Sequence, residues 1–298
     1  MIAPVVVGVD GSPSSLAAAR YAARLAVRRQ TSLDCVLAYQ PAVYAYPPMG
    51  GMDPGVLADD QVREDLDRMV AHIGDGLRDA YPELTEVTAR QVPGGPAAAL
   101  IELSREAAVT VVGSRGVGGF EQLLLGSVSS QVAAHGQGPV IVVRPVLPEG
   151  DTAEGDTDTD TAEGMAGVDP DPDAGPVLVG VDGSAESQAA LRFAAEEAQL
   201  RRTSLVLVHA RPEGDDVDVL DEVLEQAAAE VAGIPVEKRI VSSKNVEDTM
   251  IEAARSAGLT VVGCRGRGGF TGALLGSVSR ALTHHGSGAI GVVHKHDR

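Results

Sequence analysis

Short apolar runs alternate with longer amphipathic stretches along the chain. Residues 5–9 and 33–38 are continuous apolar runs typical of buried strands, and the Ala-rich stretch between them predicts a helix at 14–29, capped by Ser12 or Ser14. Apolar side chains then recur at helical spacing, at Val62, Leu66, Met69, Ile73 and Leu77. The pattern further predicts strands at 87–92, 109–112 and 140–143, and helices at 96–107 and from about residue 127. Strands that alternate with helices in this way form a parallel sheet.

The second half of the chain repeats this order. Residues 5–12 match residues 177–184 almost letter for letter, and residues 110–120 match residues 260–270. The predicted strands of this copy are 177–181, 205–208, 236–241, 259–262 and 290–293, and its helices are 186–202, 217–231, 246–257 and 277–285. Matching residues of the two copies are 172 residues apart at the start of each copy and 150 apart near its end, so the second copy is shorter in its middle. We place the difference in the irregular segment 42–59. We therefore expect two tandem doubly wound α/β domains of five strands each.

The length of 298 residues also favours two domains, which we place at 1–146 and 177–298. The segment 147–176 between them holds 10 acidic and no basic residues, more than half of the net charge of −18. It is expected to be a solvated, flexible, acidic linker. The alternative is a divalent-cation site at Asp156, Asp158 and Asp160, although the Gly and the terminal Glu of a calcium loop are missing at the required spacing.

Composition excludes several classes of protein. With 44% hydrophobic and 22% charged residues, the chain is neither collagen-like nor disordered. No apolar run approaches the roughly 18 residues of a membrane span, and no basic segment precedes the first apolar run. Cys35 and Cys264 lie in separate halves, and two cysteines are too few for the disulfide framework of a small secreted protein. We expect a reduced cytoplasmic protein without a signal peptide that binds neither membranes nor nucleic acid, since basic stripes and aromatic clusters are missing.

The candidate chemistry lies in a glycine-rich loop after the fourth predicted strand of each half. The first loop reads Gly113-Ser-Arg-Gly116, nine residues, then Gly126-Ser127, and the second copy has the same spacing. Ligands of such sheets bind at the carboxyl ends of strands where the winding reverses. Glycines let the backbone approach an anion and adopt the positive φ angles of an N–H nest, and a helix that begins at Ser127 attracts negative charge. The loop is therefore either a phosphate cradle, aided by nearby arginines, or a set of tight turns.

Other motifs fit less well. The sequence Gly-Lys-Ser/Thr of a Walker loop does not occur, and the first strand is followed by Asp-Gly-Ser rather than by the dinucleotide-binding fingerprint. Asp10 and Asp182 at the ends of the first strands are either ligand contacts or helix-capping residues. The histidines at the end of the last helix, His284 and His285, fit a helix dipole better than a metal site, so no metal ligand and no catalytic residue is predicted.

On these residues both halves resemble universal stress protein domains, and the chain resembles the tandem type over nearly everything except the linker. Nucleotide-binding members of that family carry Gly, two residues, Gly, nine residues, then Gly-Ser/Thr, and both copies match. The resemblance implies the strand order 3-2-1-4-5 and the binding of ATP, alone or with Mg²⁺. It also implies that Asp10 and Asp182, beside Gly8 and Gly180, contact the ribose or adenine side of ATP. Backbone around Leu37 and Ala38, or around Val208 and His209 in the second half, would lie at the adenine.

The resemblance further implies which residues surround the phosphates. The loops after the fourth strands would wrap them, with Gly113, Ser114, Arg115, Gly116, Val117, Gly118 and Gly119 in the first half and Gly263, Cys264, Arg265, Gly266, Arg267, Gly268 and Gly269 in the second. The following helices would complete the cradle through Gly126, Ser127, Val128 and Ser129, and through Gly276, Ser277, Val278 and Ser279. Two departures stand out. The family's Gly-x-Pro is present at 94–96 but not at 244–246. Cys264 occupies the position in the second copy that Ser114 has in the first, and it is either a redox-sensitive thiol or a small tolerated side chain.

Three functions remain open at this point. The first is a nucleotide-dependent regulatory protein of the stress response with an unidentified protein partner. The second is a slow ATPase, and the third is an interaction scaffold that binds no nucleotide. Beyond Asp10 and Asp182 the matched loops share no carboxylate, because Glu121 corresponds to Thr271, which favours binding without efficient catalysis.

The last strands of both halves are apolar and lie at predicted sheet edges, which proteins cover. The family pairs domains along this strand. We therefore expect the two halves to pair within the chain, with a homodimer of two chains as a further assembly.

Overall fold

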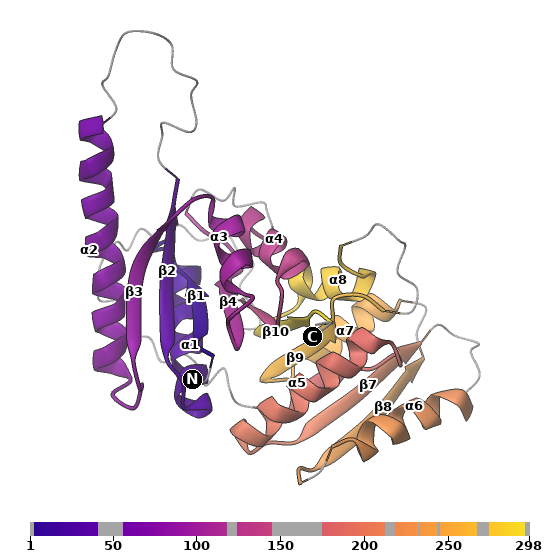
Figure 1. The fold of residues 1–298 in the computed structure, drawn as a ribbon. Coiled ribbons are helices and arrows are strands. Elements are labelled where there is room, and N and C mark those ends of the chain that lie inside the picture. The colour runs from indigo at the N-terminus through magenta and orange to yellow at the C-terminus, as the bar shows by residue number, and fades with distance from the viewer. Residues whose placement is uncertain are drawn as a thin grey trace, which may run out of the picture.

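The computed structural model describes residues 3–40, 56–117, 124–144, 175–211, 218–231, 233–242, 245–266 and 274–295. Two α/β halves lie side by side, the first in indigo to magenta and the second in orange to yellow (Figure 1). The predicted linker, apart from its last two residues, and its alternative cation site at Asp156, Asp158 and Asp160 lie outside the described residues. None of the helices in these ranges is long and apolar enough to cross a bilayer.

The elements follow the predicted order in both halves. The first half contains β1 (Val5–Gly8), α1 (Pro13–Arg29), β2 (Leu33–Tyr39), α2 (Val56–Ala80), β3 (Val87–Pro93), α3 (Pro96–Leu103), β4 (Val109–Gly113), α4 (Ser127–His135) and β5 (Val140–Val143). The second contains β6 (Val177–Gly180), α5 (Ala185–Arg201), β7 (Leu205–Arg211), α6 (Asp218–Ala229), β8 (Val236–Ser242), α7 (Val246–Ala254), β9 (Leu259–Gly263), α8 (Ser277–His285) and β10 (Ala289–Val293).

Ten strands form one sheet in the order β3-β2-β1-β4-β5-β10-β9-β6-β7-β8. Within each half all strand pairs are parallel, and each half has the order 3-2-1-4-5 when its strands are numbered separately. This confirms the predicted fold class. The central strands are buried on both faces, as their unbroken valine and leucine runs require.

Several element boundaries differ from the predictions. The irregular segment predicted to reach residue 59 is shorter, because α2 begins at Val56. The helix predicted to reach residue 107 ends at Leu103, where the Ser104 hydroxyl donates to the Ile101 carbonyl and competes with the helical pattern. In the second half α7 likewise ends at Ala254 rather than at 257. Of the two capping candidates, Ser12 is the N-cap of α1 and accepts from the Ser15 amide.

The two halves join through their last strands, as predicted. Strand β5 pairs antiparallel with β10, in a register that places Val143 opposite Ala289 and Val140 opposite Val292. Each sheet edge thereby satisfies the backbone groups of the other and leaves neither apolar strand open to other chains. Just beyond the pairing, the Arg144 guanidinium donates to the Thr283 carbonyl at 2.9 Å, across the boundary between the halves.

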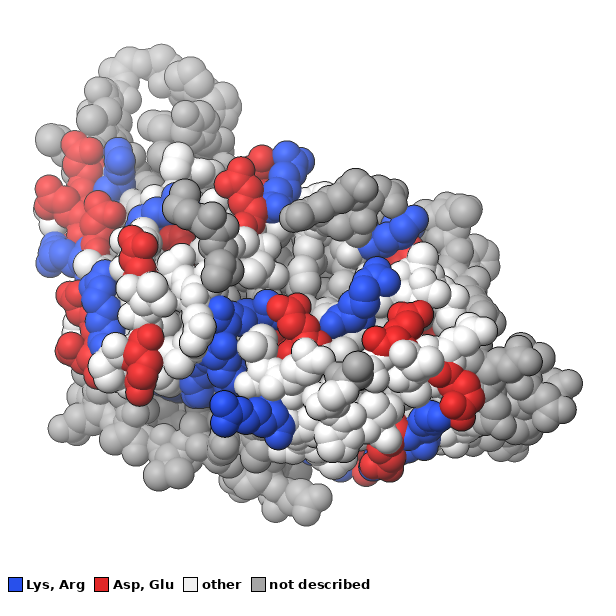
Figure 2. Space-filling view, turned by 60° about the horizontal axis from the view of Figure 1, so that its bottom comes forward, with Lys and Arg blue, Asp and Glu red and all other residues white. Residues whose placement is uncertain are grey.

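A charged cluster on α1 and α5 forms a second contact between the halves. Arg29 and Arg201 occupy equivalent positions in the two repeats, and both guanidinium groups donate to the carboxylate of Glu197, Arg29 at 2.8 Å and Arg201 at 3.3 Å. Each arginine also lies over an aromatic ring of the other half, Arg29 over Phe193 and Arg201 over Tyr21. Figure 2 shows a group of basic side chains near the middle of the molecule, with acidic side chains interspersed.

Glu197 is fully buried, whereas the neighbouring Glu196, which also bonds Arg29, is 55% exposed. Replacing Glu197 by Ala removes the carboxylate shared by two arginines, and should lower the free energy of unfolding by about 3 to 5 kcal/mol. Glu196→Ala is the matched control and should cost less than about 1 kcal/mol. Urea denaturation of both variants measures the difference; equal, small losses would show that the cluster does not hold the halves together.

Candidate functional site

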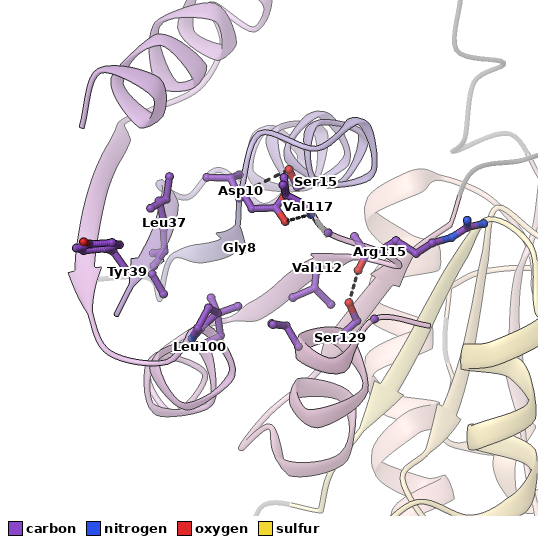
Figure 3. Close-up of a pocket in the computed structure, with 18 of the residues that line it drawn as sticks. Gly8, Asp10, Ser15, Leu37, Tyr39, Leu100, Val112, Arg115, Val117 and Ser129 are labelled. Atoms are coloured by element: carbon purple, nitrogen blue, oxygen red, sulfur yellow. Dashed lines mark hydrogen bonds between the residues drawn. The ribbon is translucent and has the colours of Figure 1, made fainter. Parts of the chain in front are cut away.

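A cavity of about 630 Å³ opens at the carboxyl ends of β1, β2 and β4 in the first half. This is the place where the winding of the sheet reverses, and its volume falls within the range of about 300 to 1,000 Å³ of small-molecule sites. Its lining combines glycine-rich backbone on one side with aliphatic side chains on the other. Figure 3 shows both sides, with Asp10, Val117 and Ser129 facing Leu37, Tyr39 and Leu100.

Asp10 fastens the loop after β4 to the end of β1. One carboxylate oxygen accepts from the Ser12 amide at 3.0 Å and from the Ser12 hydroxyl at 2.6 Å, and the other accepts from the Val117 amide at 2.8 Å. Burial raises the pKa of this carboxyl, but the hydrogen bonds from Ser12, Val117 and Ser15 outweigh it and hold the pKa below its ordinary value. In this structure Asp10 is therefore an ionised anchor of the loop.

The glycines of this loop are required by close packing. A Cβ at Gly113 would lie 2.6 Å from the Ser14 carbonyl oxygen, and a Cβ at Gly116 would overlap the Asp10 carboxylate. The expected positive φ angles are absent at Gly113, Gly116 and Gly126, so the prediction is wrong for these three glycines, while Gly118 and Gly119 lie outside the described residues. The positive φ instead belongs to Gly11, at +83°, where the chain turns from β1 toward α1.

The amino end of α4 faces the cavity without a side-chain cap. Its N-cap is Gly126, which has no side chain to accept from the first-turn amides, and Ser127, Val128 and Ser129 line the cavity. Uncapped amides and the helix dipole together favour an anion at this position. The Ser129 hydroxyl is already used, because it donates to the Gly113 carbonyl at 2.6 Å and fixes α4 against β4.

The structure brings most predicted residues of the first half to this cavity. Those that line it are Gly8, Asp10, Gly113, Arg115, Gly116, Val117, Gly126, Ser127, Val128 and Ser129. Ser114 is buried behind the loop, and the Arg115 side chain extends away from the cavity in Figure 3. Gly118 and Gly119, and in the second half Arg267, Gly268 and Gly269, lie outside the described residues.

The aliphatic side of the cavity was largely missed by sequence reasoning. Leu66 and Met69 of α2, Pro96 and Leu100 of α3, and Val36 of β2 line it. Leu66 and Met69 belong to a regular helical stripe that looks like ordinary core packing. One feature of the sequence could have indicated their role. The helix that carries them directly follows the irregular segment that makes the first copy longer than the second.

The second half repeats the backbone arrangement of the first. We call residues 113–117 and 126–129 the first cradle, and residues 263–266 and 276–279 the second cradle. The Ser279 hydroxyl donates to the Gly263 carbonyl at 2.6 Å, as Ser129 does to Gly113. Asp182 accepts from the Ser184 amide and hydroxyl at 2.9 and 2.6 Å, and a Cβ at Gly266 would overlap its carboxylate.

The remaining predicted residues of the second half occupy equivalent places. Gly180 ends β6, Arg265 follows β9, and Gly276 precedes Ser277 and Val278 at the start of α8. Cys264 is 2% exposed, and burial raises the pKa of its thiol. A buried thiol with a raised pKa is a poor nucleophile, which supports the interpretation of a small packed side chain.

Replacing Asp10 by Asn should weaken the anchor between β1 and the loop by about 1 to 3 kcal/mol at pH 7, since hydrogen bonds to a charged acceptor are lost. Because the folded pKa lies below the ordinary value of 3.8, the contribution of Asp10 is present above pH 4 and is lost as the pH falls through the folded pKa. The gap in unfolding free energy between wild type and Asp10→Asn should therefore shrink upon acidification. Urea titrations from pH 7 to pH 2.5 measure it, and a gap independent of pH would contradict the assignment.

Comparisons with known proteins agree with this architecture. The universal stress protein family model matches residues 1–144 and again residues 174–294. A universal stress protein of Mycobacterium tuberculosis is 34% identical over 296 residues, covering 94% of this chain and 93% of the relative, and a second one is 33% identical over 298 residues, covering 93% and 92%. The fold matches that of a universal stress protein from Archaeoglobus fulgidus with a TM-score of 0.71 at 20% identity, over 98% of both chains. The chain therefore belongs to the universal stress protein family.

Proposed function

We propose that this protein binds ATP in the cavity of the first half and that the bound nucleotide regulates its interaction with a protein partner. The observation that carries the proposal is the combination, in one cavity, of an uncapped helix start and an aliphatic wall. A nucleotide has the same two parts, an anionic phosphate chain and an apolar base.

The phosphates are assigned to the first cradle. The first-turn amides of α4 and the glycine backbone at residues 113 and 116 offer donors and close access, while the helix dipole adds a favourable field. Each such contact contributes only about 0.3 to 2 kcal/mol, so binding depends on the loop being held in place. The hydrogen bond from the Val117 amide to Asp10 provides that support.

The adenine is assigned to the aliphatic wall. Leu37, Leu66 and Met69 present apolar surface opposite the cradle, and Leu100 closes the floor beside Gly8. Burying both faces of a planar base between aliphatic groups is the usual source of affinity in such sites.

Holding the nucleotide is favoured over hydrolysing it. Among the described residues that line the cavity, Asp10 is the one carboxylate, and its oxygens are engaged with Ser12 and Val117. A phosphoryl-transfer enzyme needs a free base or metal-holding carboxylates near the terminal phosphate. We therefore expect at most weak ATPase activity, with Mg²⁺ bound through the phosphates if it is bound at all.

Gly116→Ala tests the proposal, because the added Cβ would overlap the Asp10 carboxylate and displace the loop. The dissociation constant for ATP, measured by isothermal titration calorimetry, should rise at least tenfold, which is about 1.4 kcal/mol. Gly266→Ala introduces the same overlap with Asp182 in the second half and is the matched control. It should leave the affinity of the first site unchanged.

Two results would contradict the proposal. Absence of binding heat with wild type at millimolar ATP would leave the loops as structural turns of an interaction scaffold. Loss of ATP binding in Gly266→Ala but not in Gly116→Ala would place the nucleotide in the other half. Rapid release of phosphate by wild type would instead favour an ATPase.

A further inference from the structure

The two cradles share their backbone arrangement but differ in one charged side chain. The offset of 150 residues that relates Gly113 to Gly263 places Glu247 at the position of Ala97. Both residues lie in the first turn of a helix that packs on the next one, α3 on α4 and α7 on α8. The second half thus has a carboxylate where the first half has a methyl group.

The Glu247 carboxylate is held at the start of α8. It accepts a hydrogen bond from the side chain of Ser277, the first residue of that helix, and lies near the guanidinium of Arg280. The hydrogen bond from Ser277 and the bond to its own amide, together with Arg280, outweigh burial and hold the pKa of Glu247 below its ordinary value. A full negative charge is therefore present there at neutral pH.

This position is the equivalent of the proposed phosphate site. In the first half Ser127 and its neighbours line the cavity, and the N-cap glycine leaves the first-turn amides uncapped. In the second half the N-cap is again a glycine, Gly276, but a carboxylate already stands beside the helix start. A phosphate placed there would face the like charge of this carboxylate, and that repulsion disfavours its binding.

The aliphatic wall also differs between the halves, which is an independent observation. Helix α2 and helix α6 are each followed by their next strand after the same number of residues, so the two helices can be aligned from their ends. In this alignment Asp218, the first residue of α6, corresponds to Met69. On β7, His209 replaces Leu37, and its Nδ1 lies 2.6 Å from the Val181 carbonyl oxygen.

We infer that Glu247 is an internal occupant of the second cradle, and that it restricts the chain to one ATP, bound in the first half. This inference rests on the proposed ATP binding in the first half. It assigns to the second half a cradle closed by its own carboxylate, and it makes Glu247 the residue that determines which of two similar sites accepts a polyphosphate.

The test is a calorimetric titration of wild type, Glu247→Ala and Glu247→Gln with ATP and Mg²⁺. Wild type should bind one ATP per chain. Both variants remove the negative charge from a side chain of intermediate exposure, so they should fold and should bind a second ATP at least tenfold more tightly than the second half of wild type does. In the Gly116→Ala background, where the first site is impaired, Glu247→Ala should restore one ATP per chain.

The reciprocal substitution gives a second, independent readout. Ala97→Glu should place a carboxylate beside Ser127 and weaken ATP binding in the first half at least tenfold. Ala97→Gln has nearly the same size without the charge and should weaken it less. Urea denaturation of each variant identifies any that fail to fold, and in that event the Glu247 variants decide the matter alone.

The outcomes separate this inference from the proposed function. Two ATP of similar affinity on wild type, or one ATP on both wild type and Glu247→Ala, would overturn the role of Glu247 while leaving ATP binding intact. A second site that Glu247→Ala weakens only in the presence of Mg²⁺ would show that the carboxylate assists a metal, and would also overturn it. Absence of any ATP binding by wild type would overturn both proposals.

Discussion

The antiparallel pairing of β5 with β10 is the interaction on which the rest of the structure depends. It turns two five-stranded sheets into one and covers two apolar edges that would otherwise be open to other chains. It also places α1 against α5, where two equivalent arginines share the single buried carboxylate of Glu197. The corresponding residue of the first repeat is Leu25, so the duplicated halves have diverged to share one carboxylate across their boundary. Such a contact fixes the halves relative to each other because a buried carboxylate without its partners is costly.

The same divergence explains why two similar cradles need not do the same thing. Backbone hydrogen bonds and glycine packing are preserved in both, so the duplication has kept the loop geometry. Side chains at equivalent positions have changed, from Ala97 to Glu247 at the helix start and from Leu37 to His209 on the second strand of each half. Under the proposals made above, one half has an open site and the other has a similar scaffold closed by its own carboxylate.

The sequence predicted the repeat and the alternation of strands and helices, because those depend on local patterns that are present twice, whereas the strand order was implied by the resemblance to the universal stress protein family. It could not predict that Asp10 anchors the loop, since the same Asp-Gly-Ser letters fit a cap, a turn or a ligand contact, and only the distance to Val117 distinguishes them. Leu66 and Met69 were not predicted to line the cavity, for a different reason. A helical stripe looks the same whether it packs on a sheet or borders a cavity, and the side that each residue faces is set by tertiary packing. The positive φ angles expected at Gly113 and Gly116 were wrong because close packing against Ser14 and Asp10 also selects glycine.

The most direct test of the central claim is a crystal structure of the wild-type protein grown with a non-hydrolysable ATP analogue and Mg²⁺. The account predicts one nucleotide per chain, with its base against Leu66 and Met69 and its phosphates at the start of α4. It also predicts that the start of α8 keeps Glu247 beside Ser277 without a phosphate. A nucleotide outside the first-half cavity, or phosphates bound at Ser277 with Glu247 in place, would contradict it.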